Sequence, residues 1–368
     1  MLIKQVEIFK CPIKLKEPFV ISLGPVSFAD NVFVLIRTSD GVTGYGECSP
    51  FKTINGESID TCFIVGQYLA KSLLGKNPLQ IDECSLVMNK TIYGNSSIKS
   101  AFDIALYDIA SQEAALPLYS FLGGTNNKQL ITDYTISIGD PLKMAADACN
   151  IIKNGFQVIK VKLGGTGSID IERMRKIRKA VGNEIPIRID ANQGWGVQEA
   201  IETLNALNKY NIQFCEEPIP RWNYMELPTV KKASPIPIMA DESCCDHHDA
   251  KRLTDIDACD LFNIKLGKSS GIHNALQIAV QAEKAGIKIQ VGGFLESRLG
   301  FTAAAHFALT SENILFYDFD TPLMFIEDPV NDGISYGPGG EVTLPEKPGL
   351  GASVNEDYLK RLEKIILN

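Results

Sequence analysis

Residues 185–190 read IPIRID, a short run of β-branched apolar residues that ends in an acid. Runs of the same kind recur about every twenty-five residues: VIKVK (158–162), IQFCEEP (212–218), IPIMADES (236–243), LFNIK (261–265) and ILFYDFD (314–320). Each is too short for a surface helix and too apolar for a loop, so it predicts a parallel strand buried on both faces. A charge at the C-terminal end of such a strand lies where a (β/α) barrel places its catalytic groups.

Working outward from these runs, we expect eight strands, at 130–137, 157–162, 186–190, 212–216, 236–240, 261–265, 287–292 and 313–318. Amphipathic helical patterns such as DIERMRKIRKAVG separate them. The predicted fold class is therefore α/β, with a (β/α)7β TIM-type barrel as the economical closure. An open doubly wound sheet is the competitor, but the Gly-rich dinucleotide fingerprint is absent.

The rest of the chain does not follow this rhythm. Residues 1–125 combine strand-like stretches with helical patterns and predict an α+β capping domain, which leaves 126–328 for the modified barrel. The Gly- and Pro-rich segment 329–368 is expected to return to the capping domain, which would then be built from both ends of the chain.

Composition limits the classes of function. The net charge of −8 and the lack of a basic stripe argue against nucleic acid as a partner. No apolar stretch approaches the roughly 20 residues of a membrane span, and the first residues do not resemble a signal peptide. The nine cysteines are scattered without CxxC pairs, which indicates buried thiols in a cytoplasmic protein. Symmetry makes a homo-oligomer the default expectation.

Three acids, Asp190, Glu216 and Asp241, close successive predicted strands. Carboxyl groups from adjacent strands meet at one edge of a parallel sheet, and three of them form an all-oxygen site with open positions, which favours Mg²⁺. For each acid alone the alternative is helix N-capping, because strand-to-helix loops commonly carry Asp at the cap. Three acids in register make a metal site the better interpretation of the set.

Lysines accompany these acids. Lys160 and Lys162 lie two residues apart and share one face of a strand, and Lys265 ends a strand four further round. Taken alone, KxK is typical of a solvated strand edge, but a strand covered by helices has no exposed face. Like charge and desolvation lower the pKa of a lysine, which prepares a general base. A metal-bound carboxylate with a lysine on each side favours removal of an α-proton.

Taken together, these motifs resemble the enolase superfamily, in its muconate-lactonizing-enzyme subgroup and, within that, the dipeptide epimerases. The resemblance covers essentially the full length and includes KSAFDIALYDIASQEAALPLYSFLGG (99–124), KVK, DANQGW, EEP, ADES, NIKLGK, GGFLESRLG and PGLG. It implies one Mg²⁺ per subunit and the following assignments: metal ligands Asp190, Glu216 and Asp241, acid/base residues Lys162 and Lys265, and Lys160 as the lysine that assists.

The last predicted strand ends in Asp318–Phe319–Asp320. Family members that act on dipeptides are known for Asp-x-Asp here, and period 2 directs both carboxylates to one side, ready to pair with a substrate α-ammonium. Helix capping or turn chemistry is the alternative. The resemblance implies further substrate-binding residues, namely Lys160, Glu296, Arg298, Thr132 and Phe19. The sequence leaves open whether Glu296 touches substrate or supports Lys265, and whether Arg298 reads an acidic group or lies on the surface.

Substrate choice is expected to depend on two loops of the capping domain, 16–28 and 51–57. The first holds apolar residues and no Arg, so Arg298 or Lys52 would have to face a substrate carboxylate. The family default is an L-Ala-L-Glu-like dipeptide, inverted at its C-terminal α-carbon by two-lysine 1,1-proton transfer through a metal-stabilised enediolate. An apolar C-terminal residue would fit the segment better. Alternatives are o-succinylbenzoate synthase, a cycloisomerase such as muconate lactonizing enzyme, N-acylamino acid racemase, or a non-catalytic binding protein.

Overall fold

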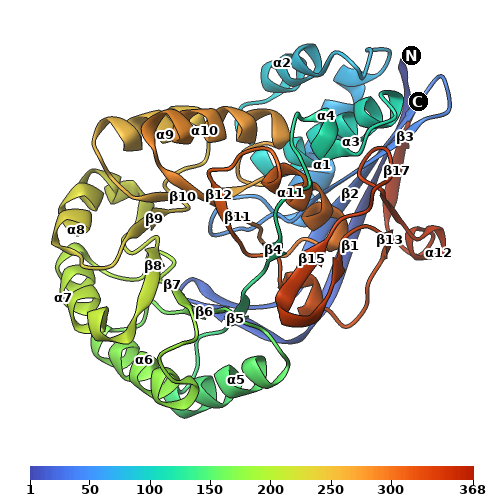
Figure 1. Cartoon of the computed structure of the whole chain (residues 1–368). Helices are drawn as coiled ribbons and strands as arrows, with labels where there is room; N and C mark the ends of the chain where they lie inside the picture. Colours follow the sequence, from blue (N-terminus) through green and yellow to red (C-terminus); the bar gives the residue numbers. More distant parts are fainter.

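Two large sheets organise the molecule, one antiparallel and one parallel (Figure 1). The computed structural model describes residues 1–368. The antiparallel sheet has the strand order β17-β1-β2-β3. Its strands are β1 (Ile3–Ile21), β2 (Gly24–Thr38), β3 (Thr43–Cys48) and β17 (Lys364–Leu367). The first and last residues of the chain therefore lie in the same sheet.

The hairpin formed by β1 and β2 is longer than the sequence indicated. The two strands pair out to Ile21 and Gly24, and the positive φ of Gly24 (118°) closes the turn. The segment 16–28, predicted as a loop, is therefore the tip of a β-hairpin. The second predicted segment, 51–57, follows β3 and lies between the antiparallel sheet and the first helix.

Helices cover one face of the antiparallel sheet: α1 (Ile59–Leu73), α2 (Ile81–Thr91), α3 (Ser96–Glu113) and the short α4 (Leu118–Phe121). The capping box of Ser58 and Thr61 begins α1. Helix α3 is buried along almost its whole length and approaches β3 closely, because Gly46 lacks a side chain where a methyl group would overlap the carbonyl of Ala101. The helical patterns predicted for α1 and α3 are confirmed.

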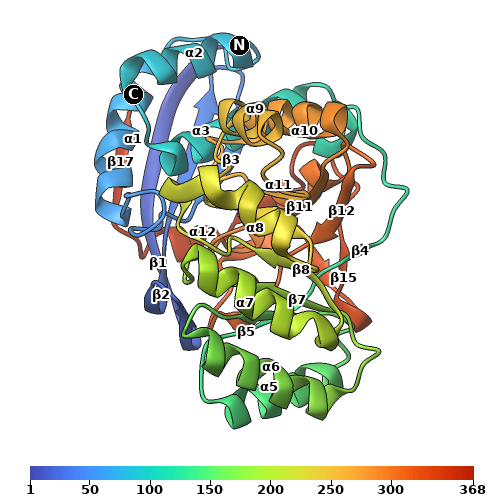
Figure 2. The ribbon, with the colours of Figure 1, turned by 90° about the vertical axis from the view of Figure 1, so that its left-hand side faces the viewer.

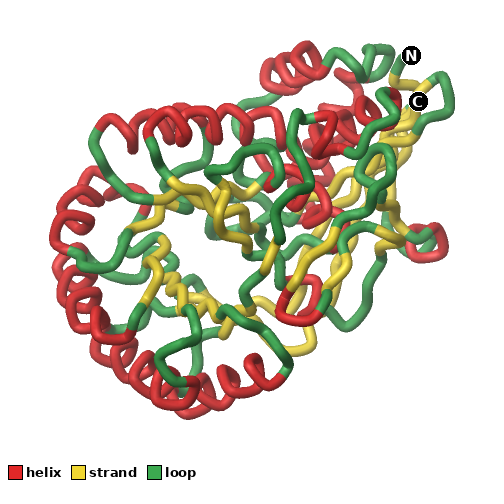
Figure 3. Tube along the Cα trace, in the orientation of Figure 1, coloured by secondary structure: helices red, strands yellow, loops and turns green.

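The parallel sheet contains eight strands, each hydrogen-bonded to the next along the chain. They are β5 (Tyr134–Ile136), β6 (Ile159–Lys162), β7 (Ile187–Asp190), β8 (Ile212–Glu216), β9 (Ile238–Ala240), β10 (Leu261–Lys265), β11 (Lys288–Gly292) and β12 (Ile314–Tyr317). A parallel bridge between Thr132 and Tyr317 brings the edge strand β12 to the segment that precedes β5. The sheet is thus curled round on itself (Figure 3), and the predicted α/β barrel is confirmed.

The strand predicted at 130–137 is wrong in its extent. Its first part, β4 (Leu130–Ile131), pairs with β15 in a three-stranded antiparallel sheet, and only β5 joins the barrel. Between them the chain passes from one sheet to the other at Thr132 and Asp133, which lie in neither strand.

Helices surround the barrel on its outer side (Figure 2). They are α5 (Pro141–Lys153), α6 (Gly167–Val181), α7 (Val197–Leu207), α8 (Leu227–Ala233), α9 (His247–Asp255), α10 (Ile272–Ala285) and α11 (Arg298–Ala308). Short 3₁₀ turns lie at Asn208–Tyr210, Arg221–Glu226, Thr321–Met324 and Pro338–Gly340. Because helices cover the outside, polar residues on the strands face inward, toward the site.

The last part of the chain contributes β13 (Val330–Asp332), β14 (Ser335–Tyr336), β15 (Glu341–Thr343), β16 (Ala352–Val354) and α12 (Glu356–Leu359). It then ends in β17, where Leu367 pairs with Val6 of β1. A large apolar cluster spans the barrel and its contact with the antiparallel sheet, and a smaller one lies between that sheet and α1–α3. None of the helices combines the length and the apolar character that crossing a membrane requires.

Candidate active site

Three carboxylates meet at the C-terminal ends of neighbouring barrel strands. Asp190 ends β7, Glu216 ends β8 opposite it, and Asp241 follows β9. All three are fully buried. The amide of Asn263 donates to Oε1 of Glu216 at 2.8 Å, and the Asn192 backbone N–H donates to Oδ1 of Asp190 at 2.8 Å. We call this set the β7–β9 triad.

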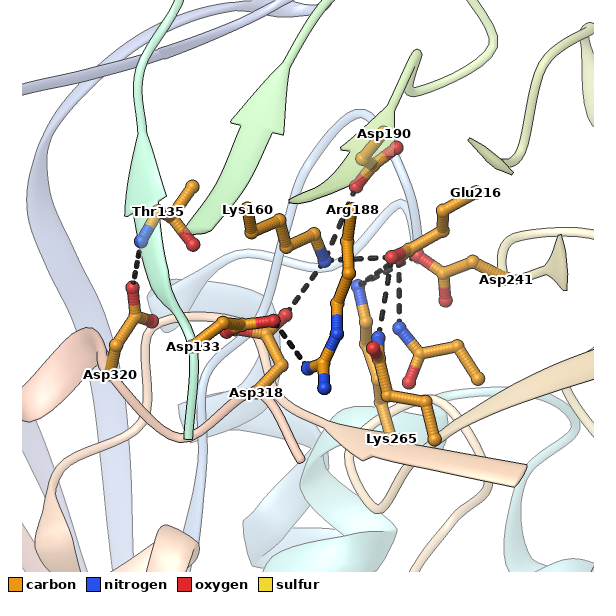
Figure 4. A network of polar contacts seen from close by, with 12 residues as sticks. Asp133, Thr135, Lys160, Arg188, Asp190, Glu216, Asp241, Lys265, Asp318 and Asp320 are labelled. Carbon is orange, nitrogen blue, oxygen red and sulfur yellow. Dashed lines mark hydrogen bonds and ion pairs between the residues drawn. The ribbon is translucent and has the colours of Figure 1, made fainter. Parts of the chain in front are cut away.

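Ammonium groups from β6 and β10 contact the triad from two directions (Figure 4). Nζ of Lys162 lies 2.6 Å from Oδ2 of Asp190, and Nζ of Lys265 lies 2.7 Å from Oδ2 of Asp241. Nζ of Lys160, which is fully buried, lies 2.7 Å from Oε2 of Glu216. The structure therefore brings together all six residues that the sequence predicted as metal ligands and lysine bases.

The titration of these groups follows their partners. Burial opposes ionisation of Asp190 and Asp241, but the lysines beside them outweigh it and lower the pKa of both acids. Burial likewise opposes the charge of Lys265, and the carboxylate of Asp241 outweighs it and raises its pKa. The sequence-based expectation that desolvation and like charge lower the lysine pKa concerned Lys160 and Lys162. It is wrong for Lys160, because the carboxylates of Asp318, Glu216 and Asp190 outweigh burial and raise its pKa well above the ordinary value.

A second group of acids lies beside the first. One carboxylate oxygen from each of Asp133, Asp318 and Asp320 lies within 4.8 Å of the other two, and all three side chains are buried. Nζ of Lys160 lies 2.7 Å from Oδ2 of Asp318, so this lysine joins the two groups. The backbone N–H of Thr135 donates to Oδ2 of Asp320 at 2.6 Å. We call Asp133, Asp318 and Asp320 the Asp133 group.

Three residues of these networks were missed by the sequence reasoning. Arg188 lies two residues before Asp190 on β7, so period 2 could have placed its side chain inside the barrel. Lys268 donates from Nζ to Oδ1 of Asp241 at 2.6 Å and follows Lys265 in the motif KLGK. Asp133, by contrast, carried no signal, because it lies in the break between β4 and β5.

A cavity lies between the hairpin tip, the segment 51–57 and the barrel. Its polar lining includes Lys162, Lys265, Asp318, Asp320 and Thr135. Its apolar lining consists of Phe19, Ile21, Phe51, Ile54, Phe294 and Leu295. The predicted substrate-binding residue Phe19 is thus in the wall of the cavity, with Nζ of Lys162 5.8 Å from its ring centre.

Three other predicted substrate-binding residues lie elsewhere. Arg298 donates to the backbone carbonyls of Val330 and Ile334, and its prediction as a reader of substrate is not supported, because the C-terminal segment uses its guanidinium. The hydroxyl of Thr132 accepts from the N–H of Phe319 at 2.8 Å and lies behind the cavity wall. Glu296 lines a neighbouring small cavity with Glu47, and burial raises its pKa to about 7.

Comparison with known proteins agrees with this geometry. Residues 3–123 match the mandelate racemase / muconate lactonizing enzyme N-terminal domain, and residues 143–358 match the enolase C-terminal domain-like family. The chain is 62% identical over 368 residues to the D-Ala-D/L-Ala epimerase of Cytophaga hutchinsonii, with 100% of both chains covered. A crystal structure of the dipeptide epimerase from that organism, complexed with Mg and D-Ala-L-Val, superimposes with a TM-score of 1.00 over 100% of both chains.

More distant relatives show the same relationship. The hydrophobic dipeptide epimerase of Enterococcus faecalis is 40% identical, over 96% of this chain and 100% of the relative. A structure of the dipeptide epimerase from that organism, with Mg and L-Leu-L-Tyr, has a TM-score of 0.93. The L-Ala-D/L-Glu epimerase of Clostridium acetobutylicum is 39% identical, over 95% of this chain and 98% of the relative. The chain therefore belongs to the mandelate racemase / muconate lactonizing enzyme family of the enolase superfamily.

Proposed function

We propose that the protein is a Mg²⁺-dependent dipeptide epimerase that inverts the α-carbon of the C-terminal residue. The observation that carries the proposal is the pair of lysines on β6 and β10, Lys162 and Lys265, which contact the β7–β9 triad from two directions at the floor of one cavity. The dipeptide epimerases that match this chain over their full length support the same activity.

The β7–β9 triad fits a hard divalent cation. Its donors are all carboxylate oxygens, fully buried, and its charge is otherwise met only by lysines. Burial and Asp190 raise the pKa of Glu216 to about 7, which indicates that one more positive charge would be accommodated. We assign Mg²⁺ to Asp190, Glu216 and Asp241, where it would act as a Lewis acid toward a substrate carboxylate.

Under this proposal the lysines carry the proton. Lys162 and Lys265 face the substrate from different strands, so one removes the α-proton and the other returns a proton to the opposite face. Lys160 contacts Glu216 and Asp318 at once and supplies positive charge where the substrate carboxylate gains electron density. The lysine that removes the α-proton must be a neutral amine, and the lysine that returns a proton must be an ammonium. Each must also exchange its carboxylate contact for the α-carbon of the substrate.

Two acids of the Asp133 group, Asp318 and Asp320, suit the α-ammonium of a dipeptide. Asp318 and Asp320 line the cavity, and a protonated amine can donate to both carboxylates. An anionic substrate end, as in o-succinylbenzoate synthesis, or an N-acylated amine would leave these acids without a cation. This difference favours an epimerase of free dipeptides over the lyase, cycloisomerase and N-acylamino acid racemase alternatives.

The cavity wall favours an apolar side chain on the C-terminal residue. Phe19, Ile21, Phe51 and Ile54 supply the capping side of the cavity, and its only cations are Lys162 and Lys265. Lys52, which the glutamate hypothesis required, lines a different cavity. Buried without a cation, a glutamate carboxylate would cost several kcal/mol of binding free energy. We therefore propose small apolar dipeptides, in place of the L-Ala-L-Glu default.

An exchange assay tests this function. The holoenzyme with Mg²⁺ is incubated in D₂O with D-Ala-L-Ala, D-Ala-L-Val, L-Ala-L-Glu and N-succinyl-L-alanine, and α-deuteration is followed by NMR. We expect exchange and epimerisation at the C-terminal α-carbon of the first two and at least about tenfold slower exchange with the others. Exchange confined to the N-succinyl compound would refute the dipeptide assignment.

We also propose a cytoplasmic homo-oligomer. A reducing compartment is supported by the nine cysteines, all of which are free thiols. Self-association is supported by Trp222 and Tyr93, which are 77% and 97% exposed and would be partly covered in an assembly. Light scattering behind size exclusion should give a mass that is a multiple of 40.3 kDa. A monomeric mass would remove the proposal of assembly.

A further inference from the structure

Beneath the cavity lies a buried ion pair that the mechanism above does not use. Asp133 is fully buried in the break between β4 and β5. Its Oδ2 accepts a hydrogen bond from Nη1 of Arg188 at 2.7 Å. Its other oxygen, Oδ1, is buried and has no hydrogen-bond partner. A buried carboxylate oxygen without a donor is costly, and it indicates that a donor is supplied by something that binds.

The unpartnered oxygen belongs to a carboxylate that faces the two acids of the ammonium subsite. Asp133 brings an oxygen to within 4.8 Å of both Asp318 and Asp320 (Figure 4). Three carboxylates this close repel one another unless a cation lies among them. Lys160 and Arg188 supply two positive charges for these three carboxylates. Burial and Asp318 still raise the pKa of Asp133 well above its usual value and that of Asp320 to about 7.

The guanidinium of Arg188 holds Asp133 in this position. Its guanidinium lies 5.0 Å from the ring centre of Phe316 and 5.7 Å from that of Phe214. Nη1 also donates to the carbonyl of Tyr317 at 3.0 Å, directly before Asp318. The same side chain therefore fixes Asp133 and the end of the strand that leads to the other two acids.

We propose that Asp133 is a third carboxylate of the ammonium subsite, and that it determines the preference for a charged over a neutral N-terminus. The inference rests on the proposed function, since it requires a dipeptide amine at Asp318 and Asp320. An α-ammonium has three N–H donors, and three acceptors from three residues would satisfy them together. Arg188 is then a positioning residue, which acts on the substrate only through Asp133 and the β12 end.

The test compares two ligands that differ only in this amine. Alanyl-alanine is the substrate, and propionyl-alanine, which replaces the ammonium by hydrogen, is the competitive inhibitor. The preference is the ratio of the inhibition constant of propionyl-alanine to the KM of alanyl-alanine, both measured with Mg²⁺ by α-proton exchange. In Asp133→Asn we expect this ratio to fall about tenfold, through a higher KM and with kcat changed much less.

Asp133→Asn leaves a buried guanidinium unpaired and can prevent folding. A second variant therefore keeps the test possible. Asp133→Asn with Arg188→Met removes both charges, and the ratio should still fall, by a smaller factor, since the carboxylate is the closer charge. Asp108→Asn is the matched control, a buried acid in α3 that accepts from the backbone of Tyr45 and Leu350. It should change stability and leave the ratio unaltered.

Two outcomes can be told apart. A wild-type enzyme that does not exchange the α-proton of alanyl-alanine would refute the proposed function. A wild-type enzyme that epimerises normally, with the ratio unchanged in a folded Asp133 variant or with kcat lowered at constant KM, would overturn the role of Asp133 alone.

Discussion

The β7–β9 triad and the Asp133 group each consist of three buried carboxylates, but the two groups have different charged neighbours. In the triad, Asp190 and Asp241 each have a lysine of their own and a lowered pKa. In the Asp133 group only Asp318 has one, and the pKa of Asp133 and Asp320 is raised. Burial is similar in both, so the sign of each shift depends on whether the nearby cations outweigh burial and the neighbouring acids. Arg188 does not outweigh them at Asp133, and Lys160 does not at Glu216. Each group lacks positive charge, which suits a metal in the triad and an ammonium in the other.

The largest effect is expected from removing a metal ligand, and it tests which of the two acid groups holds Mg²⁺. Asp241→Asn should lower kcat/KM at least about a thousandfold and weaken Mg²⁺ binding, because it removes a ligand and the partner of Lys265. Asp320→Asn should leave Mg²⁺ affinity near that of the wild type. Isothermal titration with Mg²⁺ measures both. If the affinity is lost in Asp320→Asn and kept in Asp241→Asn, the metal belongs to the Asp133 group.

The lysines come next in size. Lys162→Ala and Lys265→Ala should each lower epimerisation by about a thousandfold, within the range for removal of an acid/base group. Each variant should also keep α-deuteration of one epimer only, because the remaining lysine reaches one face of the carbon. NMR of separate D-Ala-L-Ala and D-Ala-D-Ala samples in D₂O resolves the two faces. Full epimerisation in either variant would contradict the two-base mechanism.

A smaller effect is expected on substrate binding. Asp318→Asn should raise the KM of a free dipeptide by about a hundredfold, since a buried charge pair with the ammonium is broken. The effect on kcat should be smaller, although Lys160 loses a partner at 2.7 Å. Steady-state kinetics separate the two constants. A fall in kcat without any rise in KM would show that Asp318 acts through Lys160 and not on the amine.

The smallest effect concerns stability. The pKa of Asp320 is about 7 in the folded protein and 3.8 is the ordinary value, so the native state binds more protons between these pH values. Stability from this group is present at low pH and is lost as the pH rises toward 7. The free energy of unfolding of Asp320→Asn, relative to that of the wild type, should therefore increase by on the order of 2 kcal/mol from pH 5 to pH 8. Urea unfolding without ligand at pH 5 and pH 8 measures the free energy of unfolding of both proteins. The same change with pH in wild type and variant would contradict the raised pKa.

The sequence predicted the triad and the lysines because strand periodicity and the strand end together determine where a side chain lies in a barrel. Asp190, Glu216 and Lys162 each close a short buried strand, so their position needed no tertiary information. The sequence left the role of Arg298 open because it begins a helix, and which way a helix start faces depends on its neighbours, here the C-terminal segment.

The sequence did not identify Asp133 as a site residue, for a different reason. It lies in neither β4 nor β5, so no period assigns it a face, and only the closure of the barrel brings it to Asp318. The hairpin tip was misjudged as a loop, because β1 and β2 continue to pair beyond the sheet core, where the residues are no longer alternately buried. Both errors concern contacts between segments distant in sequence.

The pairing of β17 with β1 has a consequence for synthesis of the protein. Residues 364–367 follow their partners in β1 only after all the barrel strands have been made. The barrel strands can begin to pair while the chain is still being translated, but this edge of the antiparallel sheet stays open until residues 364–367 have been made. A nascent chain stalled before residue 364 would expose that edge of β1 to pairing with another chain.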